Sequence, residues 1–163
     1  MSGAYFKIAL GAGIGILVLV SVVFWWLAQR SSTARPTLGL KYGWLLPCPD
    51  SPNCVSSHAN PNDKTHYLPP IAFTDEPEKV WERLQKLLKS FPDATIVESK
   101  NNYLRAEFRS KLFGFVDDVE FLLDRDDKVI HFRSASRVGH SDLGANRKRI
   151  EMIRATLSQS DDF

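Results

Sequence analysis

Charged side chains alternate with apolar ones along three segments of the chain, in the order expected for β-strands. In the segment 103–109 every second residue is apolar, which is the period of a strand that buries one face. The segments 116–123 and 129–135 show the same alternation. We therefore expect one face of a sheet to be apolar and the other ionic. The ionic face would carry Arg105, Glu107, Arg109, Asp118, Glu120, His131 and Arg133.

Two carboxylates of this face, Asp118 and Glu120, lie two residues apart and have the chemistry of a general acid and base. The arginines nearby are opposite charges that would occupy both carboxylates. Ion pairs between neighbouring strands are also an ordinary way to stabilise an exposed sheet. We therefore expect no catalytic pair here, and an envelope enzyme, hydrolase-like and using these carboxylates, is the alternative.

Arginines also gather around the expected start of the last helix, where free backbone N–H groups attract anions. A phosphate, a carboxylate or a lipid head group would suit such a cluster. The competing interpretation is internal pairing, because Asp142 lies in the first turn and Asp117 or Asp118 could use the arginines as partners. The arginines are Arg133, Arg137, Arg147 and Arg149.

The chain has two cysteines, Cys48 and Cys54, in a loop rich in proline and turn-forming residues. The loop favours a disulfide, and such bonds persist in oxidising compartments, so we expect the domain to face the periplasm or an equivalent lumen. A zinc site that adds His58 and His66 is the alternative, but its spacing is wider than that of structural zinc sites. We predict no metal and no cofactor. Ser56, Ser57 and His58 combine hydroxyls with an imidazole but lack any spacing typical of a nucleophile and its base.

Residues Ile8–Ala28 form an apolar run without charge, roughly 30 Å long as a helix, which matches a bilayer. The run is longer than the apolar region of a signal peptide, so we expect an uncleaved single transmembrane anchor, with a cleaved signal as the alternative. Arg30 and Arg35 follow the run, and positive charge there favours a cytoplasmic location for the rest of the chain. This is opposite to the location that the cysteines indicate. Gly11 and Gly15 have the spacing that lets two helices approach closely, which would allow a homodimer through this helix.

The remaining elements complete an α+β domain. We expect an antiparallel sheet of about four strands, 94–98, 103–109, 116–123 and 129–135, with two helices packed on its apolar face. One helix would run from a cap at Thr74 to Phe91, and the other would start at Ser141 and include Leu143 in its apolar stripe. The apolar run 112–116 is expected in the core, with the bilayer beside the anchor as the alternative. The predicted organisation is an anchor (1–30), a linker (31–43) and one domain (44–160).

The net charge of the chain argues against nucleic acid as a partner. The whole chain has a formal charge of +2, which comes from the basic residues of the anchor region, and the rest is nearly neutral. A nucleic-acid binder would show a basic patch or stripe, so we expect no nucleic acid as a partner.

Three blocks of sequence, in order, resemble the signature of the family of domain of unknown function 1499. They are Cys48–Ser57, Ala106–Glu120 and Arg133–Arg149, within a resemblance that covers roughly Trp44 to Leu157. Members of this family occur in bacterial envelopes and chloroplasts, often behind one membrane anchor, and the resemblance implies no established reaction. It directs attention to the polar members of the blocks. These are Asn53, Arg109, Asp117, Asp118, Arg133, Arg137, Asp142 and Asn146.

Taken together, the sequence predicts a membrane-anchored envelope protein whose α+β domain is a binding or interaction module. Its expected partners are the lipid bilayer and an anionic ligand or an envelope protein.

Overall fold

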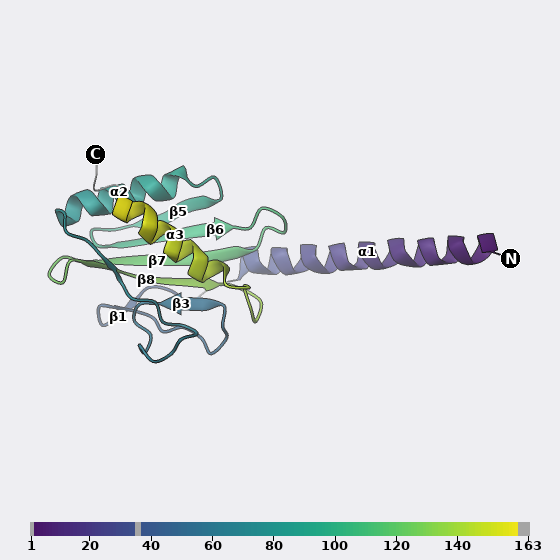
Figure 1. Ribbon diagram of the computed structural model, residues 1–163, viewed down its shortest axis with the longest axis horizontal. Coiled ribbons are helices and arrows are strands. Elements are labelled where there is room, and N and C mark those ends of the chain that lie inside the picture. Colours follow the sequence, from purple (N-terminus) through teal and green to yellow (C-terminus); the bar gives the residue numbers. More distant parts are fainter. Residues whose placement is uncertain (1, 35–36, 160–163) are drawn as a thin grey trace.

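The computed structural model describes the backbone of residues 2–34 and 37–159, and the side-chain surroundings of residues 13–34 and 37–158. A long helix, α1 (Ser2–Thr33), projects from one end of a domain in which two helices lie across an antiparallel sheet (Figure 1). The predicted α+β class and the N-terminal apolar helix are confirmed.

The main sheet has six strands where about four were expected. Its order is β3-β8-β7-β6-β5, with β4 beside β8, and every pairing is antiparallel. The four predicted strands are present, and their ends differ from the prediction by at most one residue. The two additional strands are too short to show a period of two. The bounds are β3 (Cys54–Ser56), β4 (Ile71–Ala72), β5 (Ala94–Ser99), β6 (Tyr103–Arg109), β7 (Val116–Asp124) and β8 (Val129–Ser136).

The helices α2 (Pro77–Ser90) and α3 (Ala145–Gln159) cover the apolar face of the sheet (Figure 1). Leu84 and Leu88 of α2, with Ile150 and Ile153 of α3, belong to the same buried cluster as the apolar residues of the central strands. This shared core fixes which face of the sheet remains for polar chemistry.

Both helices begin later than predicted. The first residue of α2 is a proline, which suits a helix start because its missing N–H needs no partner there, and Glu76 rather than Thr74 precedes it. At α3 the cap is Asp142 instead of Ser141, since its carboxylate accepts hydrogen bonds from the backbone N–H groups of Gly144 (3.0 Å) and Asn146 (2.8 Å). Leu143 therefore lies outside the helix and does not join its apolar stripe.

The helix α1 is the part of the described chain that is long and apolar enough to span a membrane, over Gly13–Thr33. Its last turns pack on the domain. The buried hydroxyl of Ser31 accepts a hydrogen bond from the backbone N–H of Val116 at the start of β7 (2.8 Å). Gly15 has open space around it, and the surroundings of Gly11 lie outside the described residues, so pairing of two helices stays a prediction.

The prediction that the run 112–116 enters the core is wrong except for Val116. Leu112 is 81% exposed, and Phe113 stacks on Phe24 of α1 with 4.3 Å between ring centroids. The physical reason is that α2 and α3 already fill the apolar face of the sheet. The loop between β6 and β7 instead lies beside α1.

The opposite, charged face of the sheet is covered, although it was expected to be exposed. Its cover is the chain from residue 37 to residue 49, which includes a hairpin of β1 (Leu40–Lys41) and β2 (Trp44–Leu45). Leu45 forms a small buried cluster with Tyr103 and Leu122 of the sheet. Part of the predicted linker, from residue 37 to residue 43, therefore lies in this cover. The covering segment makes the charged face the wall of a cavity.

Candidate functional site: the charged face of the sheet

The register of three neighbouring strands places the charged residues together. Arg105 of β6 lies opposite Glu120 of β7, which lies opposite Arg133 of β8. Glu107 of β6 lies opposite Asp118 of β7. Directly opposed residues share a face of a sheet, so the alternation that the sequence shows becomes a ladder of opposite charges.

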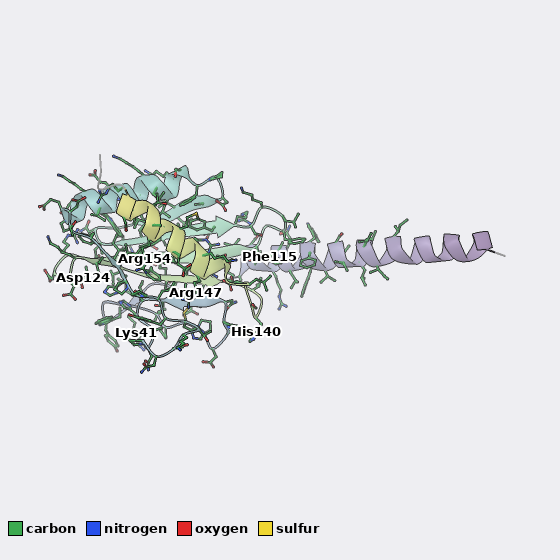
Figure 2. All side chains as sticks on the ribbon, viewed as in Figure 1. Lys41, Phe115, Asp124, His140, Arg147 and Arg154 are labelled. Carbon is green, nitrogen blue, oxygen red and sulfur yellow. A yellow bond between two sulfur atoms is a disulfide. The ribbon has the colours of Figure 1, made fainter. Side chains whose placement is uncertain are left out.

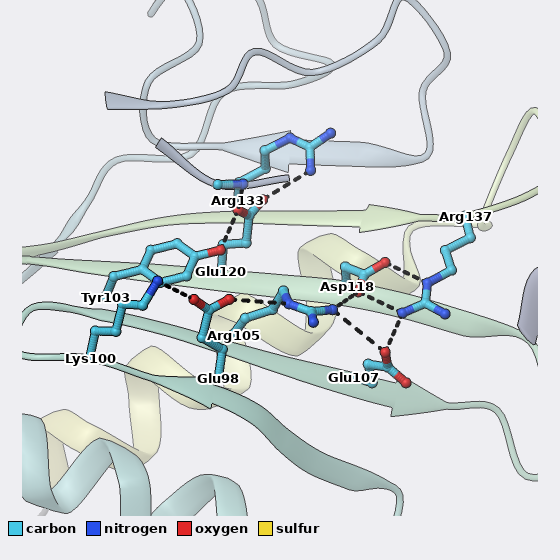
Figure 3. Close-up of polar contacts among 10 residues, drawn as sticks. Glu98, Lys100, Tyr103, Arg105, Glu107, Asp118, Glu120, Arg133 and Arg137 are labelled. Carbon is cyan, nitrogen blue, oxygen red and sulfur yellow. Dashed lines mark hydrogen bonds and ion pairs between the residues drawn. The ribbon is translucent and has the colours of Figure 1, made fainter. Parts of the chain in front are cut away.

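Asp118 is buried and bound by two arginines (Figure 3). Arg137 donates from Nε to Oδ2 (2.6 Å) and from Nη2 to Oδ1 (2.9 Å), and Arg105 donates from Nη1 to Oδ1 (3.1 Å). Arg137 also pairs with Glu107. The hydrogen bonds to Asp118 are the largest cause that raises the pKa of Arg137 above its usual value. The charge-assisted pairs hold the Arg137 guanidinium in one orientation.

Glu120 is the second buried carboxylate, and it has donors on three sides. It accepts hydrogen bonds from Tyr103 Oη (2.8 Å), the backbone N–H of Gly39 (2.6 Å) and Arg133 Nη1 (3.1 Å). Burial, and then the neighbouring charge of Glu120, raise the pKa of Tyr103 above its usual range. Both carboxylates of the predicted pair are thus engaged by hydrogen bonds within the protein, and arginine is a donor to each of them.

A cavity of about 570 Å³ lies between this face and the covering segment. Its charged lining consists of Lys41, Arg133 and Arg137 against one carboxylate, Asp118, which is already bound by arginines. Arg133 is only 6% exposed, and its Nε is buried without a hydrogen-bond partner among the described residues. The cavity is therefore positive, and one of its guanidinium groups has a donor left over.

The disulfide predicted between Cys48 and Cys54 is present, with 5.7 Å between the two Cα atoms. Cys54 is fully buried in β3 and pairs with Ala135 of β8, whereas Cys48 lines the cavity. The bond thus ties the covering segment to the sheet. It also consumes the two thiolates of the alternative zinc site, and His66 instead hydrogen-bonds Asp63 (2.6 Å).

The predicted binding residues lie in four places. Asp118, Arg133 and Arg137 meet at the cavity. Asp117 points to the other face, because adjacent residues of a strand alternate, and pairs there with Arg149 of α3 (2.6 Å). The other predicted residues do not line the cavity. Asp142 and Asn146 lie at the start of α3, where Asn146 bonds the Asn53 carbonyl, and Arg109 bonds the hydroxyl of Ser32 near the end of α1.

Two residues of the site escaped sequence reasoning. Lys41 lies in a segment that looked like a linker, and nothing in its local pattern indicates that it returns to the sheet. Tyr103 was detectable, because it occupies the polar side of the alternation in β6.

A second cluster lies beside the site, at Ser57, His58 and His131. The hydroxyl of Ser57 contacts His131 Nδ1 (3.1 Å), while the His58 ring packs on the His131 ring with 4.2 Å between centroids. The ring of Trp44 meets His58 edge-on (4.7 Å). Burial, followed by the charge of His131, lowers the pKa of His58 to about 4, and burial also lowers the pKa of His131. Both imidazoles are thus favoured as neutral, packed rings.

Comparison with known proteins gives one finding. The sequence model of a family described as "Protein of unknown function (DUF1499)" matches residues 44–157, which include the six strands of the main sheet, α2 and most of α3. No curated protein and no solved structure matches the chain.

Proposed function

The chain belongs to the DUF1499 family of proteins of unknown function, and since the family supplies no reaction, we propose from the charged cavity that it is a membrane-anchored binding module for a small anionic ligand. The apolar helix α1 serves as the anchor, and the cavity between the covering segment and the sheet receives the ligand.

The observation that carries this proposal is the buried guanidinium of Arg133. Its one ion pair, with Glu120, uses Nη1, while its Nε stays buried without a partner among the described residues. A buried donor left unpaired costs about 1–3 kcal/mol, and Arg133 lines the cavity, so an anionic group that reaches Nε from there would recover this cost. The planar, forked guanidinium favours carboxylate and phosphate oxygens.

The rest of the lining defines the kind of ligand. A volume of about 570 Å³ suits a small organic molecule rather than a bare ion. Leu38 and Leu46 offer apolar contact, and Lys41 adds a charge from the hairpin of the cover. A phosphate or carboxylate with a compact, partly apolar body fits these features.

The disulfide supports a location outside the cytoplasm. A bond between Cys48 and Cys54 persists where thiols are oxidised, so the domain is proposed to face the periplasm or an equivalent lumen of the cell envelope. The alternative of a hydrolase has less support, because Asp118 and Glu120 are both engaged by arginine.

Binding is tested by following thermal unfolding of the full chain in detergent micelles during titration with inorganic phosphate and with glycerol phosphate. Wild type is expected to gain stability in a saturable way, because a ligand that binds only the folded state raises the unfolding midpoint. Lys41→Gln removes an exposed charge from the cavity and should weaken binding without loss of a buried ion pair.

The matched control is Lys86→Gln, the same charge change on the exposed side of α2. It should bind both probes like wild type. The proposal fails if neither probe stabilises wild type, or if both substitutions weaken binding equally, as general charge attraction would require.

A further inference from the structure

We propose that the domain rests directly on the lipid surface, with the loop between β6 and β7 (110–115) and the loop between β8 and α3 (137–144) inserted into the head-group region. This inference depends on the proposed membrane anchor and adds a second contact of the protein with lipid. The partner is a bilayer, recognised by apolar side chains with basic residues beside them.

The depth of the first loop follows from its contact with α1. Phe113 stacks on Phe24 (4.3 Å between centroids), and Phe115 packs against Phe24 edge-on (6.4 Å). Phe24 lies four residues before Ala28, the end of the apolar run, which is about 6 Å along a helix axis. If α1 spans the bilayer, Phe113 therefore lies at a level inside the apolar run, closer to the bilayer centre than Ala28.

Polar contacts fix the domain at this height. The hydroxyl of Ser31 accepts from the backbone N–H of Val116 (2.8 Å), and Arg109 donates to the hydroxyl of Ser32 (3.1 Å). Val116 and Arg109 directly flank the loop 110–115, and the serines lie in the last turn of α1. The spacing between the anchor and the sheet is thus determined by direct bonds and not by a free linker.

Two leucines in these loops are exposed without any packing role in the domain. Leu112 is 81% exposed, and Leu143 is 90% exposed. Leu143 also adopts a left-handed backbone conformation (φ 54°), which a leucine rarely takes and which here presents its side chain to the outside. Two leucines exposed at the end of the domain where α1 leaves it would be covered if that end rests on lipid.

The two loops flank α1 where it leaves the domain (Figure 1). Phe115 in the first loop and His140 in the second lie at this same end of the domain, whereas Asp124 lies at the opposite end (Figure 2). The leucines therefore belong to the end that an anchored domain turns toward the membrane.

Basic and aromatic residues complete this surface. Arg30, Arg109 and Lys111 are exposed near the helix end, where they would meet lipid phosphates. Trp25 and Trp26 are exposed on α1 at the level where tryptophan favours the membrane interface. Such a combination is typical of a protein surface that enters a bilayer by about 5–10 Å.

The test places a fluorescent label, nitrobenzoxadiazole, on single introduced thiols in the full chain, reconstituted in phosphatidylcholine vesicles with phosphatidylglycerol. The native cysteines are joined in the disulfide, so labelling without reductant is directed to the new thiol. Leu112→Cys and Leu143→Cys report on the loops. Val18→Cys reports on the anchor, and Asp126→Cys reports on the exposed turn at the far end of the sheet.

Nitroxide on the lipid head group or high on the acyl chain is expected to quench the labels at residues 112 and 143, while the label at residue 126 keeps its fluorescence. Deep nitroxide is expected to quench the label at residue 18. If the label at residue 18 is quenched but the label at residue 112 or 143 keeps its fluorescence like the label at residue 126, α1 spans the membrane and this inference is wrong. If residue 18 is not quenched by any lipid, the anchor itself is wrong, and the inference falls with it.

Discussion

Glu120 is a fully buried carboxylate that is stabilised by a phenol, a backbone amide and a guanidinium. The substitution Glu120→Ala leaves the Arg133 charge buried without its partner, which typically costs about 3–5 kcal/mol. We expect the free energy of unfolding to fall by this order, as measured by urea unfolding of the full chain in micelles.

Glu78→Ala is the matched control for this change. Glu78 forms an exposed ion pair with Arg125 (3.0 Å), and such pairs contribute little to stability. Equal unfolding midpoints for the two variants would show that the Glu120 network does not stabilise the sheet.

His58 makes stability depend on pH. Its pKa in the folded protein is about 4, mainly because of burial, against 6.5 for the free side chain. Between these values the unfolded chain binds more protons than the folded one, so stability is complete above pH 6.5 and falls as the pH drops toward 4. His131 contributes in the same direction, since burial lowers its pKa although Asp124 and Asp127 oppose the shift.

The measurement compares the slope of unfolding free energy against pH, from 7 to 4, in wild type and His58→Gln. The substitution should flatten the slope, while His140→Gln, at an exposed position, should leave it unchanged. An identical slope in all three proteins would contradict the shifted pKa of His58.

Among the elements, the contact between α1 and β7 has a specific signature. The N–H of Val116 is protected by the hydroxyl of Ser31. Ser31→Ala removes the acceptor, so hydrogen exchange at the Val116 amide should accelerate, and the helix should separate from the domain more readily. Thr33→Ala serves as the control, because the Thr33 hydroxyl bonds only carbonyls of its own helix among the described residues. Unchanged exchange in Ser31→Ala would mean that α1 is not docked on the domain.

The regular elements were predictable, because strands β5 to β8 and the helices α2 and α3 carry apolar periodicities over many residues. The covering segment was not, since β1 and β2 have two residues each and owe their place to contacts distant in sequence, such as the bond from Gly39 to Glu120. The sequence therefore indicated the charged side chains but not the cavity, because the cavity forms only where the covering segment lies over them. It also grouped Asp117 with Asp118, although alternation along β7 sends them to opposite faces.

At the scale of the whole molecule, the proposed topology places the disulfide and the cavity outside the cytoplasm. In intact cells treated with a membrane-permeant alkylating agent, Cys48 and Cys54 should stay unmodified because they are joined in the disulfide. They should become modified once a reductant is added. A reporter that is active only outside the cytoplasm should work when fused after residue 163. Free thiols together with a cytoplasmic reporter would reverse the proposed orientation.

The proposal of an anchored binding module rests most on the Nε of Arg133, which is buried without a hydrogen-bond partner among the described residues. The direct measurement is the ¹⁵N resonance of Arg133 Nε in the labelled full chain during titration with inorganic phosphate and glycerol phosphate. We predict a saturable shift of this resonance, without a shift at Arg147, whose guanidinium already donates to the backbone carbonyls of residues 64, 65 and 67. An Arg133 resonance that stays in place with both probes, or that moves only in parallel with Arg147, would contradict an anion site in the cavity.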